Sequence, residues 1–91
     1  MAQKAVGLIE AVGWAGCLEA ADVALKTADV TLIGFEKANG GGRLVVRIEG
    51  DVSAVQAACE AAVASANKVS SVYAYRVLAR PATEVSKLLR K

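Results

Sequence analysis

The sequence predicts an α+β domain with the ferredoxin-like order βαββαβ, followed by a short C-terminal helix. Two observations lead to this fold class. Segments rich in β-branched or alternating apolar residues are interleaved with segments whose apolar residues recur three and four positions apart. A glycine-rich turn joins the second and third strand segments, as in a hairpin. An antiparallel sheet covered on one face by two helices is the arrangement typical of this order.

The first strand is expected at residues 6–12 and the first helix at about residues 14–28. The apolar residues at helical spacing, expected to form the buried face, are Leu18, Ala21, Leu25 and Ala28. The charged residues of the opposite face are Glu19, Asp22, Lys26 and Asp29. Asp22 and Lys26 have the i,i+4 order that stabilises an exposed helix face.

The second and third strands are expected at residues 30–37 and 43–49, joined by the loop Ala38–Gly42. One face of the third strand is expected to be buried and the other polar, from the alternation of Leu44, Val46 and Ile48 with Arg43, Arg47 and Glu49. Within the loop, Asn39-Gly40 is a strong hairpin signal, because both residues accept positive φ. The further glycines indicate that backbone closely approaches a ligand or other copies of the chain.

The second helix is expected at residues 52–67, with Asp51 capping the free amides of its first turn. Its surface is rich in alanine, which lets a helix lie close to a sheet or to another helix. The fourth strand is expected at residues 72–78 and ends before Pro81, since proline cannot donate to a strand ladder. Thr83 is placed to cap the short last helix.

The length of 91 residues and the uninterrupted composition indicate one domain, residues 1–91. The chain is 55% hydrophobic but only 4% aromatic, so a subunit interface is expected to add to the burial that small side chains provide. The net charge of +2 and the scattered basic residues argue against nucleic acid. Charges recur throughout, and no uncharged interval is longer than Ala11 to Leu18, which is far shorter than the ~18 residues of a membrane-spanning helix. The N-terminus also lacks a secretory layout. A soluble cytosolic protein is expected.

The sequence shows no catalytic or metal-binding constellation. Cys17 and Cys59 are far apart and histidine is absent, so a zinc site is not expected and both thiols are expected in the core. The segment Gly13–Gly16 lies between a strand and a helix but matches no phosphate-binding motif, so a tight turn explains it. The carboxylates are not gathered as acid–base catalysis requires. The chain is therefore not expected to be an enzyme, and no cofactor is implied.

Two features have functional alternatives that the sequence does not favour. Cys17 lies near a helix start, where the helix dipole lowers a thiol pKa, but no histidine base accompanies it. Tyr73 and Tyr75 share one face of a strand and would stack bases in an RNA-binding sheet of this topology. The aromatic residues of the neighbouring strand that such sheets use are missing, so RNA binding is not expected.

Several segments stand in an order and spacing that resemble a known family. They are Val6-Gly7-Leu8-Ile9-Glu10, Leu18-Glu19-Ala20-Ala21-Asp22, residues 30–37 with the glycine-rich loop, residues 50–55, and Arg80-Pro81. In this pattern the chain is similar to the single-domain, hexamer-forming shell proteins of bacterial microcompartments, from about Ala5 to Leu89.

The resemblance implies a cyclic homohexamer that tiles into a shell in the bacterial cytoplasm, alongside other shell proteins and encapsulated enzymes. It implies a central pore for small polar metabolites, lined by Lys37, Ala38, Asn39, Gly40, Gly41 and Gly42. It also implies an edge between hexamers formed by Lys26, Asp29 and Arg80. The simpler alternatives are that Lys26 only pairs with Asp22 and that Arg80 only ends a strand.

The chain departs from the family pattern at these same places. Its loop is one residue longer than the common Ile-Gly-Ser-Gly stretch and lacks serine; Ala82 replaces a frequent histidine, and Asp29 a frequent asparagine. The atypical loop favours a catabolic metabolosome over a carboxysome. The alternative function is a small oligomeric ferredoxin-like ligand-binding or regulatory protein, in which Gly40 to Gly42 would cradle a phosphate or nucleotide.

Overall fold

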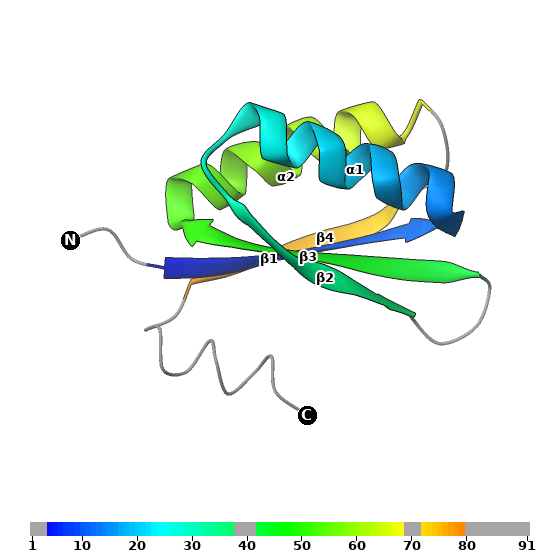
Figure 1. Cartoon of the computed structure of the whole chain (residues 1–91), viewed down its shortest axis with the longest axis horizontal. Coiled ribbons are helices and arrows are strands. Elements are labelled where there is room, and N and C mark those ends of the chain that lie inside the picture. The colour runs from blue at the N-terminus through cyan, green and yellow to red at the C-terminus, as the bar shows by residue number, and fades with distance from the viewer. Residues whose placement is uncertain (1–3, 38–41, 69–71, 80–91) are drawn as a thin grey trace.

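The computed structural model describes residues 4–37, 42–68 and 72–79. Its elements follow the predicted order (Figure 1): β1 (Lys4–Val12), α1 (Gly13–Thr27), β2 (Thr31–Lys37), β3 (Arg43–Asp51), α2 (Val52–Ala66) and β4 (Val72–Ala79). The predicted bounds hold to within one or two residues at most element ends. The predicted last helix, with Thr83, lies outside the described residues.

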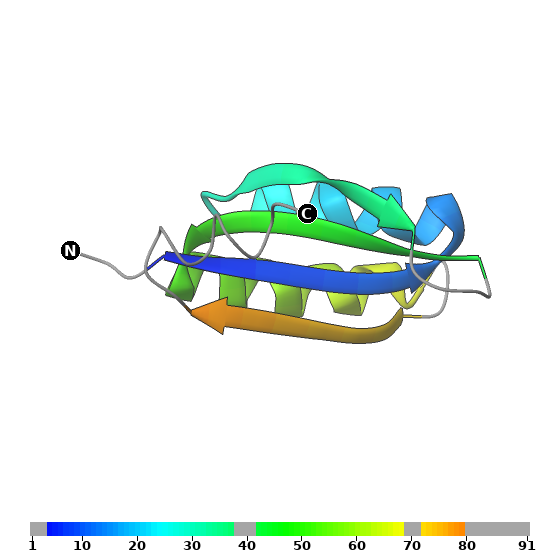
Figure 2. The same cartoon turned by 90° about the horizontal axis from the view of Figure 1, so that it is seen from below.

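The four strands form one antiparallel sheet in the order β2-β3-β1-β4. Both helices lie on the same face of this sheet, and the order and layering of the predicted fold class are confirmed (Figures 1 and 2). The second helix, α2, packs mainly on β1 and β4, whereas α1 packs on β1 and β3 and less on β2. The molecule therefore has two unlike edges, one formed by α1 and β2 and the other by α2 and β4.

The core lies between the sheet and the helices and is built from small and medium-sized side chains. Leu44, Val46 and Ile48 of β3 face the helices at 5%, 0% and 0% exposure, which confirms the predicted alternation. The second helix lies very close to the sheet at Gly7. A Cβ at Gly7 would stand 2.8 Å from both Cys59 Sγ and Val55 Cγ1, so glycine is required there by close packing.

The buried face of α1 differs from the predicted one. Leu18 and Leu25 are 54% and 45% exposed. The residues that face the core are smaller: Gly16, Cys17, Ala20, Ala21 and Ala24. The helix carries two adjacent apolar stripes. The sheet and α2 pack against the stripe of small residues, because small side chains allow closer approach. The predicted face was therefore correct for Ala21 and wrong for the two leucines.

The predicted cap of α2 is also wrong in its chemistry. Asp51 occupies the N-cap position with extended backbone, but its side chain makes no cap hydrogen bond. Its carboxylate instead lies 3.7 Å from the Lys4 ammonium at the start of β1. The position of the helix start followed from the sequence, whereas the partner of the carboxylate depended on the neighbouring strand.

Candidate functional site

A backbone hydrogen bond holds the base of the β2–β3 hairpin, and it was not predicted from the sequence. Lys37 is paired with Leu44 at the ends of β2 and β3 that adjoin the loop. The Gly13 N–H donates a hydrogen bond of 2.9 Å to the Gly42 carbonyl, which joins the start of α1 to the end of the loop. The hairpin is thus anchored to the helix layer as well as to its own strands.

Both glycines of this contact have positive φ, +74° at Gly13 and +68° at Gly42. Other residues adopt this backbone region at a cost of about 1–2 kcal/mol. The structure therefore supports the reading of Gly13 as a turn residue, and it gives the last glycine of the loop a conformational reason. Of the residues expected to line a pore, Lys37 and Gly42 flank the loop in the structure; Ala38, Asn39, Gly40 and Gly41 lie outside the described residues.

Charged side chains surround the hairpin base on the face of the sheet that the helices leave open. Arg43 pairs with Glu10 at 3.1 Å, and Arg47 pairs with Glu36 across β2 and β3. Lys37 is exposed and has no ion pair with another described residue. Where the hairpin leaves the sheet, Lys37 therefore keeps a positive charge that no described carboxylate neutralises.

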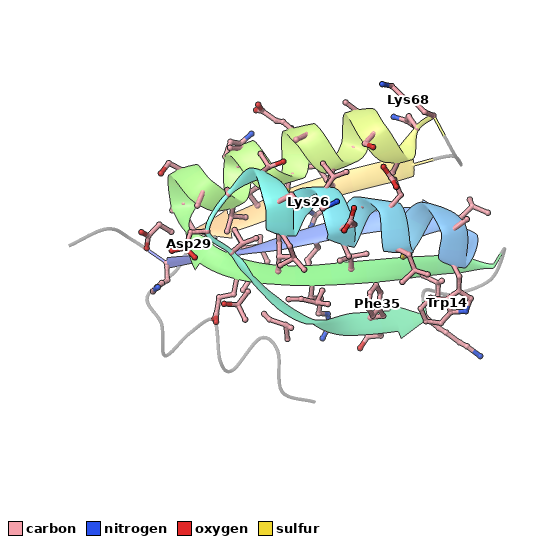
Figure 3. All side chains as sticks on the ribbon, turned by 45° about the horizontal axis from the view of Figure 1, so that its top comes forward. Trp14, Lys26, Asp29, Phe35 and Lys68 are labelled. Atoms are coloured by element: carbon pink, nitrogen blue, oxygen red, sulfur yellow. The ribbon has the colours of Figure 1, made fainter. Side chains whose placement is uncertain are left out.

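The residues expected at a hexamer edge lie at the other end of β2. Lys26 is in the last turn of α1 and is exposed, with its ammonium 3.0 Å from the Asp22 carboxylate. Asp29 follows in the turn before β2 and is also exposed. Figure 3 shows Asp29 at the end of the molecule opposite Trp14 and Phe35. Arg80 lies outside the described residues.

The strand β2 separates these two groups of residues. From Thr31 to Lys37 it advances roughly 20 Å at the usual rise per residue. The hairpin base and the Lys26–Asp29 turn are therefore remote from each other in one protomer. The fold places one at an end where loops can converge and the other at the far end.

The described residues offer no catalytic machinery. Within residues 4–37, 42–68 and 72–79, no three histidine, cysteine or acidic residues gather as a metal site requires. Burial raises the pKa of the Cys17 thiol; burial, with a contribution from Glu60, raises the pKa of Cys59 to about 11. Cys17 lies in the second turn of α1 and is completely buried, so it is a core residue as expected.

Two surface grooves in the described part are open and small. One, of about 200 Å³, is lined by Leu8, Glu10, Val45, Tyr75 and Arg76. Another, of about 140 Å³, is polar and lined by Lys4, Asp29, Thr31, Glu49, Gly50 and Asp51. Tyr75 is in register with Ile9, a core residue on the helix-covered face. This register is opposite to what base stacking on an open sheet requires. No described helix is long and apolar enough to cross a membrane.

One surface feature was missed from the sequence. The exposed ring of Trp14 meets Phe35 edge-on, with ring centroids 5.6 Å apart, close to the hairpin base (Figure 3). Together with the exposed Leu18 it forms an apolar surface on α1. The signal was present in the spacing of Trp14, Leu18 and Leu25, but the two leucines were assigned to the buried face and Trp14 was given no role.

Comparisons with known proteins agree with this architecture. A model of the BMC domain family matches residues 5–81. The bacterial microcompartment shell protein PduA of Citrobacter freundii is 45% identical over 91 residues, which are 100% of this chain and 97% of the relative. The carboxysome shell protein CcmK2 of Synechococcus elongatus is 47% identical over 79 residues, covering 85% of this chain and 76% of the relative.

A solved structure gives the same result for the fold. A microcompartment protein from Desulfitobacterium hafniense DCB matches with a TM-score of 0.80 at 31% identity. The match covers 96% of this chain and 49% of that chain, so the present chain spans about half of that protein. The fold class and the family resemblance predicted from the sequence are confirmed.

Proposed function

Because the chain belongs to the BMC domain family, we propose that it is a microcompartment shell subunit that assembles into cyclic hexamers with a central pore. It is a structural protein rather than an enzyme, which agrees with the names of its relatives. Its partners are other copies of itself, other shell proteins and the enzymes that the shell encloses. Its place is the shell of a compartment in the bacterial cytoplasm.

The observation that carries the pore assignment is the anchored hairpin base. Gly42 is tied to Gly13 at 2.9 Å, so the end of the loop has a fixed position relative to α1. Six such loops around an axis present backbone amides and small side chains to the opening. Clustered amides in glycine-rich turns form concavities that bind anions, and Lys37 adds an exposed cation on each protomer. We therefore expect small anionic or polar solutes to pass more readily than apolar ones.

The opposite end of the protomer is proposed to join hexamers into a sheet. Lys26 and Asp29 are exposed there, and Arg80 is proposed to reach the same junction with its planar fork of donors. The Asp22–Lys26 ion pair is compatible with this role, because both side chains remain largely exposed, Lys26 at 76% and Asp22 at 55%. Such a pair exchanges partners at little cost.

Within this role we place the chain in a catabolic metabolosome. The loop between Lys37 and Arg43 is longer than the common pattern and has no serine, which favours a pore adapted to a different solute. Reading the genes that neighbour this one is the direct test. Genes for carbon fixation there would contradict the catabolic assignment and leave the shell role intact.

The assembly is tested by sedimentation velocity and electron microscopy of the purified protein. The expected result is a species of six protomers that forms sheets when concentrated. A protomer or dimer at millimolar concentration would contradict the proposal. The alternative, a ligand-binding protein, predicts a shift in melting temperature with a phosphate or nucleotide, because a ligand at ~100 times its dissociation constant adds ~2.7 kcal/mol of stability.

The pore is tested by solute flux through assembled shells. Replacing Lys37 by Gln removes one positive charge per protomer, and we expect anion flux to fall while the flux of neutral solutes is unchanged. Lys4→Gln is the control, because Lys4 is also exposed but pairs with Asp51 at the end of β1 and β3 remote from the hairpin. Equal anion flux in the two variants would contradict a role for Lys37 at the pore.

A further inference from the structure

Arginine side chains recur on the face of the sheet that the helices leave open. Arg43 and Arg47 alternate along β3 with residues of the core, so both point away from the helices. On β4, Arg76 precedes Val77, which packs against the core, and therefore has the same direction. Each of these arginines carries a positive charge that a carboxylate can neutralise.

Two of the three arginines have a carboxylate partner within the chain. Glu10 lies 3.1 Å from Arg43, and Glu36 accepts a hydrogen bond from Arg47. Arg76 is exposed and forms no ion pair with another described residue. The guanidinium of Arg76 is therefore available to a carboxylate that the described part of the chain does not provide.

Arg76 also lines a groove that spans three strands. The groove has a volume of about 200 Å³, and the rest of its lining is Leu8, Glu10, Val45 and Tyr75. These residues come from β3, β1 and β4, which lie side by side in the sheet (Figure 2). Leu8 is in register with Arg76, and Glu10 with Val45, so the apolar and charged side chains are direct neighbours across the strands.

The lining has the two features that favour a carboxylate with an aliphatic chain. A guanidinium presents a planar fork of donors that matches both oxygens of a carboxylate. Leu8 and Val45 provide apolar surface beside it, and burying one CH₂ group of a ligand raises affinity about fourfold. The charge of Glu10 is offset by Arg43 at 3.1 Å, so Arg76 determines the net charge of the groove.

The size of the groove sets the length of the ligand. At about 200 Å³ it is smaller than the ~300–1,000 Å³ of pockets that hold drug-sized molecules. A monocarboxylate of about four to six carbons has few enough atoms to fit, and a ligand of this size in an open groove has a dissociation constant on the order of millimolar. Inorganic phosphate gains nothing from Leu8 and Val45, and a neutral alcohol gains nothing from the charge of Arg76.

We propose that this groove binds short aliphatic monocarboxylates, with the carboxylate on Arg76 and the chain on Leu8 and Val45. The site belongs to a single protomer and goes beyond the proposed shell role, because it does not depend on the ring or on the pore. It gives an arginine without a described partner a function beside an apolar floor. A shell subunit with this site binds organic acids on its surface as well as passing solutes through a pore.

The first test is saturation-transfer-difference NMR of the full-length wild-type protein with pentanoate as the probe. We expect transfer to the chain protons of pentanoate and a titration in the millimolar range. Acetate and 1-pentanol should each bind about tenfold more weakly, because one lacks the apolar chain and the other the charge. Equimolar phosphate should not displace pentanoate. Absence of transfer, or displacement by phosphate, would overturn this inference and leave the shell role intact.

The second test changes the cation. Arg76→Gln removes the charge, and we expect the affinity for pentanoate to fall about tenfold or more. Arg76→Lys keeps the charge without the planar fork and should show a smaller loss. Lys4→Gln is the control, because Lys4 is exposed at the far end of β1, pairs with Asp51 and does not line the groove. Its affinity for pentanoate should equal that of the wild type.

Circular dichroism verifies that each variant folds. Unchanged affinity in folded Arg76→Gln, or an equal loss in Lys4→Gln, would overturn the assignment of the carboxylate to Arg76. If Arg76→Gln does not fold, the comparison of pentanoate, acetate and 1-pentanol on the wild-type protein still decides whether the groove selects charge and chain together.

Discussion

The two helices of this chain have the same length and cover the same face of the sheet, yet they treat their large side chains differently. Each spans 15 residues and buries five small or medium-sized ones. The first helix leaves Trp14, Leu18 and Leu25 exposed, whereas no residue of α2 is among the exposed large hydrophobics. Packing within one protomer accounts for the large apolar side chains of α2, which are buried or packed against the core. For α1 it accounts for only one of two apolar stripes, and the second stripe is available for another protein chain.

The largest expected effect tests how closely α2 lies on the sheet. Gly7→Val inserts a side chain where even a Cβ would stand 2.8 Å from Cys59 Sγ and Val55 Cγ1. We expect a loss of about 3 kcal/mol in the free energy of unfolding, at the upper end for overpacking a core. Urea denaturation measures it.

The matched control for this substitution is Gly34→Ala on β2. A Cβ at Gly34 meets nothing within 4 Å, and its φ is not positive. We therefore expect a change in stability below about 0.5 kcal/mol, as for substitutions at unconstrained surface positions. Similar losses at Gly7 and Gly34 would show that the close approach of α2 to β1 is not what requires glycine.

The next prediction compares the two helices directly. Val55 of α2 is completely buried, and Val55→Ala should cost about 2 kcal/mol through lost contacts and a cavity. Leu18→Ala removes more atoms but from a side chain that is 54% exposed. In the dissociated protomer it should cost less than about 0.5 kcal/mol.

The effect of Leu18→Ala is expected to differ between the dissociated protomer and the hexamer. Leu18→Ala should weaken the hexamer even though it hardly affects the protomer, and Val55→Ala should do the reverse. Denaturation of diluted protein and sedimentation of concentrated protein separate the two quantities. Equal effects of Leu18→Ala on both would show that Leu18 contributes to the core of its own chain.

The sequence predicted some parts of this structure better than others, for physical reasons. Alternation along β3 has only two possible faces, and the charged residues Arg43 and Arg47 exclude one of them. The helix α1 is different, because two adjacent stripes of its surface are apolar and periodicity alone does not choose between them. The stripe with alanine and glycine is buried because both the sheet and α2 pack against it.

The candidate site was predicted to a similar extent. The hairpin and its glycines were visible in the sequence, and so was the Asp22–Lys26 pair. The contact of Gly13 with Gly42 was not visible, because it joins segments 29 residues apart whose proximity follows from the folded sheet. Contacts of this kind require the topology before they can be inferred.

A smaller effect on stability is expected at the start of α1, where Gly13 contacts the hairpin. Gly13 has a φ of +74°, so Gly13→Ala should cost about 1 kcal/mol through backbone strain. The start of α2 has no such requirement, and Ser53→Ala in its first turn, at an exposed residue, should be nearly neutral. Thermal denaturation measures both, and a neutral Gly13→Ala would contradict the proposed strain at the hairpin anchor.

The smallest effect on stability, with the clearest effect on assembly, is expected at the end of α1. Lys26→Ala removes an ion pair between exposed groups 3.0 Å apart, which contributes about a few tenths of a kcal/mol on a helix surface. Alanine has a slightly better helix propensity than lysine, so the net change in the melting temperature should be close to zero. Hexamers should form as in the wild type, because Lys26 lies about 100° around the helix from the Trp14–Leu25 stripe.

Sheets of hexamers, in contrast, should be lost in Lys26→Ala when electron microscopy examines concentrated protein. Lys68→Ala removes another exposed lysine, after α2, and should leave both hexamers and sheets intact. Normal sheets from Lys26→Ala would remove this residue from the edge between hexamers. Loss of hexamers in the same variant would instead mean that the charged end of α1 contributes to contacts within the hexamer.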